Sequence, residues 1–172
     1  MSDMIPFAGD AAATARGLLA MVRFARDLHA APVPETMEPL PPLNARGGRS
    51  LPTRGWRSVY SVVITEDMCN PLGGLHGGAA ATLIDTVNSA SLAVLTTESF
   101  WGPPMLTGLT LTLDLAYYNA CPAGTKARLT VTIEHLSGTL CNLRGELTDW
   151  ETGKRFVTGS QVKTWRDLRG KL

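Results

Sequence analysis

The stretch GGAAATLIDTVNSASLAVLTT, residues 77–97, determines which fold this chain can adopt. It contains no proline, and no glycine follows Gly78, so its length and its many alanines and leucines predict a single long helix. Asp85 is the only charged residue in the stretch. A helix that is apolar on nearly every side has to be enclosed by other elements. We therefore expect a central helix wrapped by a sheet.

Five segments of alternating sequence flank this helix, one before it and four after it. In the second of them, Leu111 and Leu113 alternate with Thr112, and such alternation of apolar and polar residues is typical of β-strands. The expected strands lie at residues 55–66, 107–118, 126–136, 139–149 and 154–165. This order of elements predicts an α+β domain with an antiparallel sheet.

The first 54 residues form a lead-in to this domain, which spans residues 55–172. Residues 11–31 place apolar side chains on one face and arginines elsewhere, which predicts a helix docked on the domain or on a neighbouring subunit. A mitochondrial presequence is the alternative, but the acidic residues of this region count against it. Residues 32–52 contain six prolines and predict an extended connector without regular structure.

Length and composition exclude several other classes of protein. At 172 residues the chain has the length of one domain. Its net charge of +1 argues against a dedicated nucleic-acid binder, and it has no uninterrupted run of about 18 uncharged apolar residues that would predict a membrane span. The three histidines lie too far apart for an ordinary zinc site, so we expect no metal. The three cysteines form no C-x-x-C pair, which indicates a reducing compartment, and we expect a cytoplasmic protein.

The window NPLGGLHGG, residues 70–78, leads directly into the central helix. Because Gly77 and Gly78 have no side chains, the N–H groups of the first helical turn are open to a ligand oxygen, where the helix dipole adds positive charge. Such a place can hold an anion or polarise a carbonyl. No Gly-Lys-Ser/Thr follows, which excludes a phosphate-binding P-loop. The alternative is a turn that only lets strand and helix pack.

Asp85 lies eight residues after Gly77, among apolar neighbours. A buried carboxylate without partners costs several kcal/mol, so it has to be paired or used. Thr82 and Asn88 lie three residues to either side on the same helix face and are candidate partners. The functional interpretation is a general base that acts on water beside a carbonyl held by the glycine N–H groups.

Two further residues of the window, and one strand face, each allow two interpretations. His76 either acts as a base or fixes the turn by hydrogen bonding. Asn70 either donates to a substrate carbonyl or ties down the loop. Thr110, Thr112 and Asp114 share one predicted strand face, which is exposed to solvent unless another subunit covers it.

The pattern Asn70-x-x-Gly73-x-x-His76-Gly77-Gly78, followed by Asp85, resembles the hotdog-fold acyl-CoA thioesterases of the PaaI-like group. The segments TLDL at 112–115, CPAG at 121–124 and TGK at 152–154 agree with it, and the resemblance covers about residues 55–165. It implies an antiparallel sheet around a long central helix. It also implies a homodimer or homotetramer with active sites between subunits.

The resemblance assigns a role to each residue of the motif. Gly77 would offer its backbone N–H to the thioester carbonyl, helped by Asn70. Asp85 of the neighbouring chain would activate or orient water, and Thr112 occupies the position where close relatives carry a serine that helps hold this water. His76 would support the loop or the leaving thiolate.

The implied substrate is acyl-CoA lying across the subunit interface, hydrolysed without metal or redox cofactor. Close relatives carry a lysine in the loop at 137–139 and a tyrosine at the position of Asn119, and both differ here. The lead-in would lid the acyl tunnel or cover a sheet edge. The substrate-binding residues would be His76, Gly78, Asp114, Asn119, His135, Ser137, Gly138 and Thr139.

Two other functions are compatible with the same fold. One is a non-catalytic acyl-CoA-binding or scaffold protein. The other is a hydratase, which would need an aspartate and a histidine a few residues apart on one loop, a pattern that we do not find.

Overall fold

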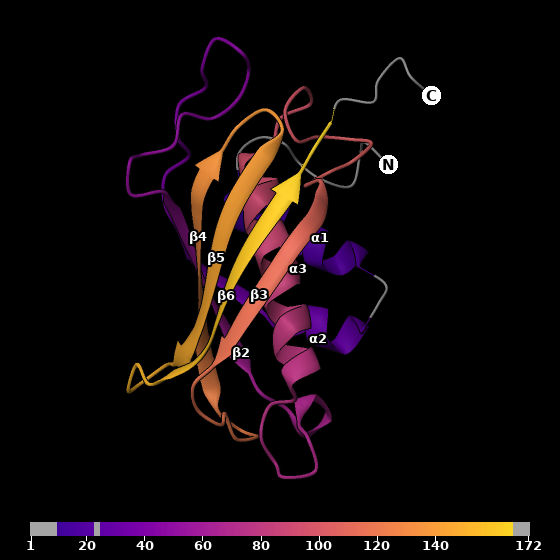
Figure 1. Ribbon diagram of the computed structural model, residues 1–172, viewed down its shortest axis with the longest axis vertical. Coiled ribbons are helices and arrows are strands. Elements are labelled where there is room, and N and C mark those ends of the chain that lie inside the picture. The colour runs from indigo at the N-terminus through magenta and orange to yellow at the C-terminus, as the bar shows by residue number, and fades with distance from the viewer. Residues whose placement is uncertain (1–9, 23–24, 167–172) are drawn as a thin grey trace.

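A computed structural model describes residues 10–22 and 25–166 of the chain and shows a sheet packed over one long helix (Figure 1). Its strands are all antiparallel and follow the order β1-β2-β4-β5-β6-β3. The predicted α+β class and the central helix are confirmed, and each predicted strand lies within three residues of its observed bounds. The elements are α1 (Ala11–Met21), α2 (Arg26–Ala30), β1 (Val33–Met37), β2 (Trp56–Val63), α3 (Gly77–Leu95), β3 (Leu109–Tyr117), β4 (Lys126–Leu136), β5 (Leu140–Asp149) and β6 (Arg155–Thr164), with a 3-10 turn at Glu66–Met68.

The central helix α3 approaches the middle of the sheet unusually closely. A Cβ atom at Gly145 of β5 or at Gly159 of β6 would lie 2.9 or 2.8 Å from Ile84 Cγ2, so these two glycines make room for the helix. With 19 residues and a mean hydropathy of 1.3, α3 is the one helix in the described ranges with the length and composition of a membrane span. Most of it is buried inside the domain, where it forms the core.

The proline-rich connector contains a strand, so the prediction that residues 32–52 lack regular structure is wrong. β1 pairs antiparallel with β2, with Val33 opposite Ser61. Proline is compatible with a strand at this position because β1 is the outermost strand of the sheet. Of the two roles considered for the lead-in, covering a sheet edge is the one that the strand order shows for this segment.

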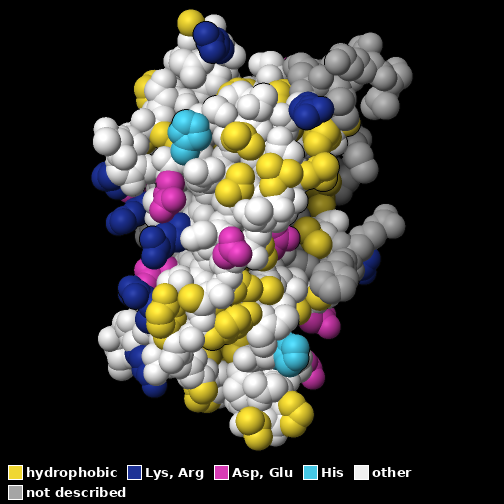
Figure 2. All heavy atoms as spheres, viewed as in Figure 1, with side chains coloured by type: hydrophobic (Ala, Val, Ile, Leu, Met, Phe, Trp, Pro, Cys, Tyr) yellow, Lys and Arg dark blue, Asp and Glu magenta, His cyan; other side chains and the backbone are white. Residues whose placement is uncertain are grey.

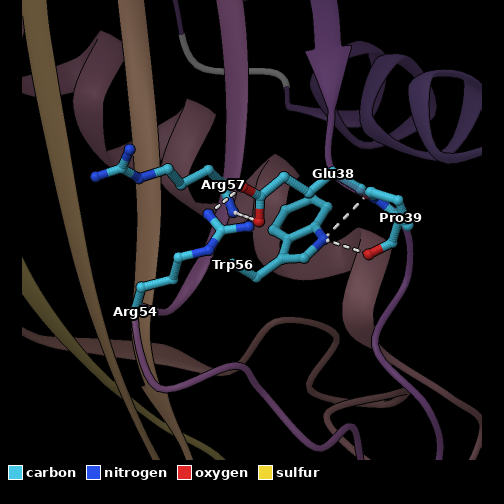
Figure 3. A network of polar contacts seen from close by, with 5 residues as sticks. All are labelled: Glu38, Pro39, Arg54, Trp56 and Arg57. Atoms are coloured by element: carbon cyan, nitrogen blue, oxygen red, sulfur yellow. Dashed lines mark hydrogen bonds and ion pairs between the residues drawn. The ribbon is translucent and has the colours of Figure 1, made fainter.

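The rest of the connector is fastened to the start of β2 by a network around Glu38 (Figure 3). The Arg54 guanidinium donates to Glu38 Oε1 at 2.5 Å, and the Arg57 N–H donates to Glu38 Oε2 at 3.1 Å. The indole N–H of the fully buried Trp56 donates to the carbonyl oxygens of Glu38 and Pro39, each at 3.2 Å. These bonds hold both ends of the long loop together.

The predicted helix at residues 11–31 is two helices rather than one. α1 begins at the cap residue Asp10, whose carboxylate accepts from the N–H groups of Ala12 and Ala13. The helices are interrupted before α2, where Ala25 has a left-handed backbone with φ of 47°. α1 buries Leu18 and Leu19 and packs against α3 and β1, which confirms the prediction of a docked helix.

Candidate active site

Asn70 organises the loop that precedes α3. Its Oδ1 accepts from the N–H of Leu72 at 2.9 Å and from that of Gly74 at 3.4 Å. The Asn70 N–H also donates to the Gly74 carbonyl at 2.8 Å. In the described part of the chain the side-chain Nδ2 has no acceptor, so it remains a free donor. Asn70 therefore ties down the loop with its oxygen while its NH₂ group stays available to a ligand.

Of the two glycines at the start of α3, only Gly77 presents an open N–H group. His76 is the cap residue, and its Nδ1 accepts from the Gly78 N–H at 3.0 Å. Gly78 is therefore already paired, whereas the Gly77 N–H has no acceptor among residues 10–22 and 25–166. The Tyr117 hydroxyl donates to the Gly77 carbonyl at 2.9 Å and packs over this residue. His76 thus fixes the turn and leaves the Gly77 N–H open at the positive end of the helix dipole.

The partners of Asp85 come from the sheet and not from its own helix. Its Oδ1 accepts from Thr110 Oγ1 at 3.0 Å and from Gln161 Nε2. Thr82 donates instead to a carbonyl one turn earlier, and Asn88 donates to Gln161 Oε1 at 3.0 Å. Neither of the two predicted helix partners donates a hydrogen bond to the carboxylate. Asp85 is half-buried, and its Oδ2 has no partner in the described residues.

A bulge in β3 decides which threonine reaches Asp85. Thr110 pairs with Lys163 of β6, but the register then shifts, and Thr112 pairs with Val162. Because cross-strand partners share a face, Thr110 points toward α3 and Thr112 points to the outer face of the sheet. The prediction that Thr110 and Thr112 share a strand face is therefore wrong, and the hydroxyl beside Asp85 belongs to Thr110. The regular alternation of leucine and threonine in this segment gives no sign of the extra residue.

Lys163 and Gln161 belong to this site, and the sequence analysis missed both. Lys163 is only 4% exposed, and its Nζ donates to Ser89 Oγ at 3.0 Å and to Thr110 Oγ1 at 3.1 Å. Burial lowers the pKa of Lys163, and the nearby charge of Asp85 opposes that shift. Their sequence does carry a signal: a spacing of two in β6 places both polar side chains on the same strand face as the buried Val157.

The predicted binding residues of the β4–β5 turn lie far from Gly77 within one subunit. The β4–β5 turn is at the opposite end of the molecule from the start of α3 (Figure 1). In that turn the Ser137 hydroxyl accepts from the Leu140 N–H at 2.9 Å. Asp114 pairs with Ser160 on the outer face of the sheet, and the Asn119 amide donates to the Arg155 carbonyl at 2.8 Å. The turn and its flank carry His135, Ser137, Gly138 and Thr139.

The outer face of the sheet separates charge from hydrophobic surface. Lys and Arg side chains gather along one side of this face, and hydrophobic side chains lie toward the other (Figure 2). Several of the cations are already engaged: Arg128 lies 4.6 Å from the Trp150 ring, and Arg155 pairs with Glu146 at 2.5 Å. On β3, Leu111 is 57% exposed.

Comparison with known proteins relates this chain to thioesterases. No family model matches it. It is 31% identical to acyl-coenzyme A thioesterase 13 of Mus musculus over 105 residues, which are 61% of this chain and 70% of that protein. Thioesterase superfamily member 2 of Mus musculus superposes with a TM-score of 0.69 at 22% identity, over 91% of this chain and 98% of that one. The E. coli PaaI protein superposes with a TM-score of 0.54 at 16% identity, over 67% and 80%.

The architecture and the sequence relationship together identify the class of protein. A sheet around one long helix, shared with both solved structures, is the hotdog fold. The sequence similarity to acyl-coenzyme A thioesterase 13 shows the family in addition to the fold. The chain belongs to the hotdog-fold, PaaI-like thioesterase family and is a thioester hydrolase, as the motif around His76 predicts.

Proposed function

We propose that this protein hydrolyses acyl-CoA to a carboxylic acid and free CoA, with Asp85 as general base. The observation that carries the proposal is the state of this carboxylate: two donors hold Oδ1, and Oδ2 has no partner in the described residues. A water molecule bound at Oδ2 would give one proton to Asp85 while its oxygen bonds to the thioester carbon. The C–S bond then breaks and CoA leaves as its thiolate. The similarity to acyl-coenzyme A thioesterase 13 supports this substrate class.

The start of α3 supplies donors for the carbonyl oxygen of the thioester. The negative charge that develops on the carbonyl oxygen needs donors that are already in place. The Gly77 N–H lies at the positive end of the helix dipole, and the Asn70 Nδ2 is a free donor on the preceding loop. We assign these two groups to the thioester oxygen.

One subunit alone does not bring Asp85 close enough to a carbonyl bound at Gly77. Asp85 lies eight residues after Gly77 on the same helix, so the two are about 12 Å apart along its axis. Reacting atoms need to be within about 3.5 Å of one another. A water molecule on Asp85 therefore cannot attack a carbonyl bound to Gly77 of the same chain, and the site requires a second copy.

The free edge of the sheet indicates how the second copy binds. β3 is an outermost strand, with Thr110, which contacts Asp85, at one end and Tyr117, which contacts Gly77, at the other. If two β3 strands pair antiparallel about their midpoints, Thr110 of one copy lies one residue from the position opposite Tyr117 of the other. Asp85 of one copy then faces Gly77 of the other, twice in each dimer. We propose this homodimer as the active unit.

Leu111→Arg should separate the dimer. Leu111 is 57% exposed on the unpaired edge, and a charge there would have to be buried in the proposed interface. We expect sedimentation velocity to show a shift to monomer, with at least a tenfold loss of turnover at the same protein concentration. Leu43→Arg is the matched control, because Leu43 is 56% exposed in the connector. A monomeric wild-type protein with full turnover would rule out the shared site.

Thr110→Val should lower kcat about tenfold, because it removes one of the two hydrogen bonds that orient Asp85. Thr112→Val makes the same chemical change on the outer face of the same strand and should alter kcat by less than about twofold. Steady-state kinetics of both variants on one acyl-CoA distinguish the two positions. A larger loss at Thr112 would restore the residue that the family resemblance indicates.

The proposed reaction itself is tested with a panel of acyl- and aryl-CoA substrates and a thiol-trapping reagent. We expect release of one free thiol per substrate consumed, fastest with apolar acyl groups. Stoichiometric binding of acyl-CoA without thiol release would instead identify a non-catalytic acyl-CoA-binding protein.

A further inference from the structure

Lys163 is a buried cation to which the proposed reaction assigns no role. It is 4% exposed and extends from β6 toward α3, where Nζ donates to Ser89 Oγ at 3.0 Å and to Thr110 Oγ1 at 3.1 Å. No ion pair holds its charge in the described part of the chain. The titratable groups that face it are Asp85 from α3 and Cys141, its neighbour on β5.

The hydrogen bonds of Thr110 show what Lys163 does. A hydroxyl group has one proton to donate and two lone pairs to accept with. Thr110 Oγ1 accepts from Lys163 at 3.1 Å and from Gln161 Nε2 at 2.9 Å, so both lone pairs are occupied. Its proton can then go only to Asp85 Oδ1, 3.0 Å away. Lys163 thereby sets the direction of the hydroxyl proton.

Gln161 completes the arrangement. Its Oε1 accepts from Asn88 Nδ2 at 3.0 Å, which turns its NH₂ group toward Asp85 and Thr110. Both hydrogens of that group are used, one on each partner. Asp85 Oδ1 is thus held by two donors whose orientations are themselves determined by Lys163 and Asn88.

We propose that Lys163 is a positioning residue for thioester hydrolysis, which acts through Thr110 to hold the Asp85 carboxylate in its productive orientation. This inference rests on the proposed function of Asp85. Lys163 does not touch the reacting atoms, because Thr110 lies between its ammonium group and the carboxylate.

The cost of burying Lys163 separates this role from a structural one. A buried ammonium group loses its hydration, and burial accordingly lowers the pKa of Lys163. Even a buried ion pair can often be replaced by apolar residues of similar size without loss of stability, because its burial is so costly. Burial of the ammonium group therefore gives no stability by itself. If Lys163 positions Thr110, replacing it by methionine should lower turnover without lowering stability.

The test compares Lys163→Met with Lys154→Met, which removes the same charge from the exposed turn between β5 and β6. We expect Lys163→Met to lower kcat about tenfold with KM unchanged and with a thermal midpoint equal to or above that of the wild type. Lys154→Met should change none of these quantities. An unchanged kcat, or a lower midpoint that accompanies the loss, would overturn the inference.

A double-mutant cycle shows whether Lys163 acts through Thr110. Once Thr110→Val is present, adding Lys163→Met should lower kcat by less than about twofold further. Two independent tenfold losses would contradict the inference. Asp85→Asn, measured in the same assay, keeps the two proposals apart. If Asp85→Asn retains turnover, the proposed function fails. If Asp85→Asn loses turnover but Lys163→Met retains it, only the inference about Lys163 fails.

Discussion

Asp85→Asn is expected to lower kcat on acyl-CoA about a thousandfold. General-base catalysis contributes roughly 10²–10⁴-fold, and an amide cannot take the proton that the attacking water must lose. The side-chain oxygen of the introduced amide can still accept from Thr110 and Gln161, so the hydrogen bonds that orient the group remain. The loss corresponds to about 4 kcal/mol in the barrier and is a loss of chemistry rather than of structure.

Assembly and folding are followed in the same Asp85→Asn preparation. Its sedimentation coefficient should match that of the wild type, and its thermal midpoint should not fall. Asp67→Asn is the matched control, because Asp67 is an exposed aspartate on the 3-10 turn, and it should keep wild-type turnover. Turnover of Asp85→Asn within threefold of the wild type would rule out Asp85 as the base.

Gly77→Pro should lower kcat by about a hundredfold or more, because it removes the backbone donor assigned to the thioester oxygen. Loss of one oxyanion donor typically costs 10²–10³-fold in kcat. The position tolerates proline structurally: Gly77 is the first residue of α3, where an N–H has no helical partner. His76 before it has φ of −67° and ψ of 137°, the extended conformation that precedes proline.

Gly77→Ala separates the lost N–H from the added bulk. It keeps the N–H and adds a Cβ atom 3.4 Å from the Tyr117 hydroxyl oxygen, a contact that a small shift can accommodate. We expect the alanine variant to keep at least a third of the wild-type kcat. Circular dichroism should show unchanged helix content in both variants. Equal losses in the two would mean that space at Gly77, not its N–H, limits the reaction.

Short stretches of sequence were sufficient to predict the central helix and the strands that follow it. The apolar composition of residues 77–97 predicts the central helix, and the alternation in residues 126–136 predicts β4 with its observed bounds. Asn70 and Gly77 could be placed at one loop because both lie within a few residues of the helix start. The connector was mispredicted because proline excludes a central strand but permits an edge strand, and only the position of β1 beside β2 shows which applies.

By itself, then, the sequence determined that a carboxylate lies on an apolar helix two turns after a glycine-rich start. Only the tertiary structure decided what surrounds that carboxylate. The partners of Asp85 lie 25 and 76 residues further along the chain, and they meet it through the register of β3 on β6. A bulge of one residue exchanges the two faces of a strand without altering its alternating pattern. Thr110 rather than Thr112, and the buried Lys163 behind it, therefore become visible only when the strands are paired.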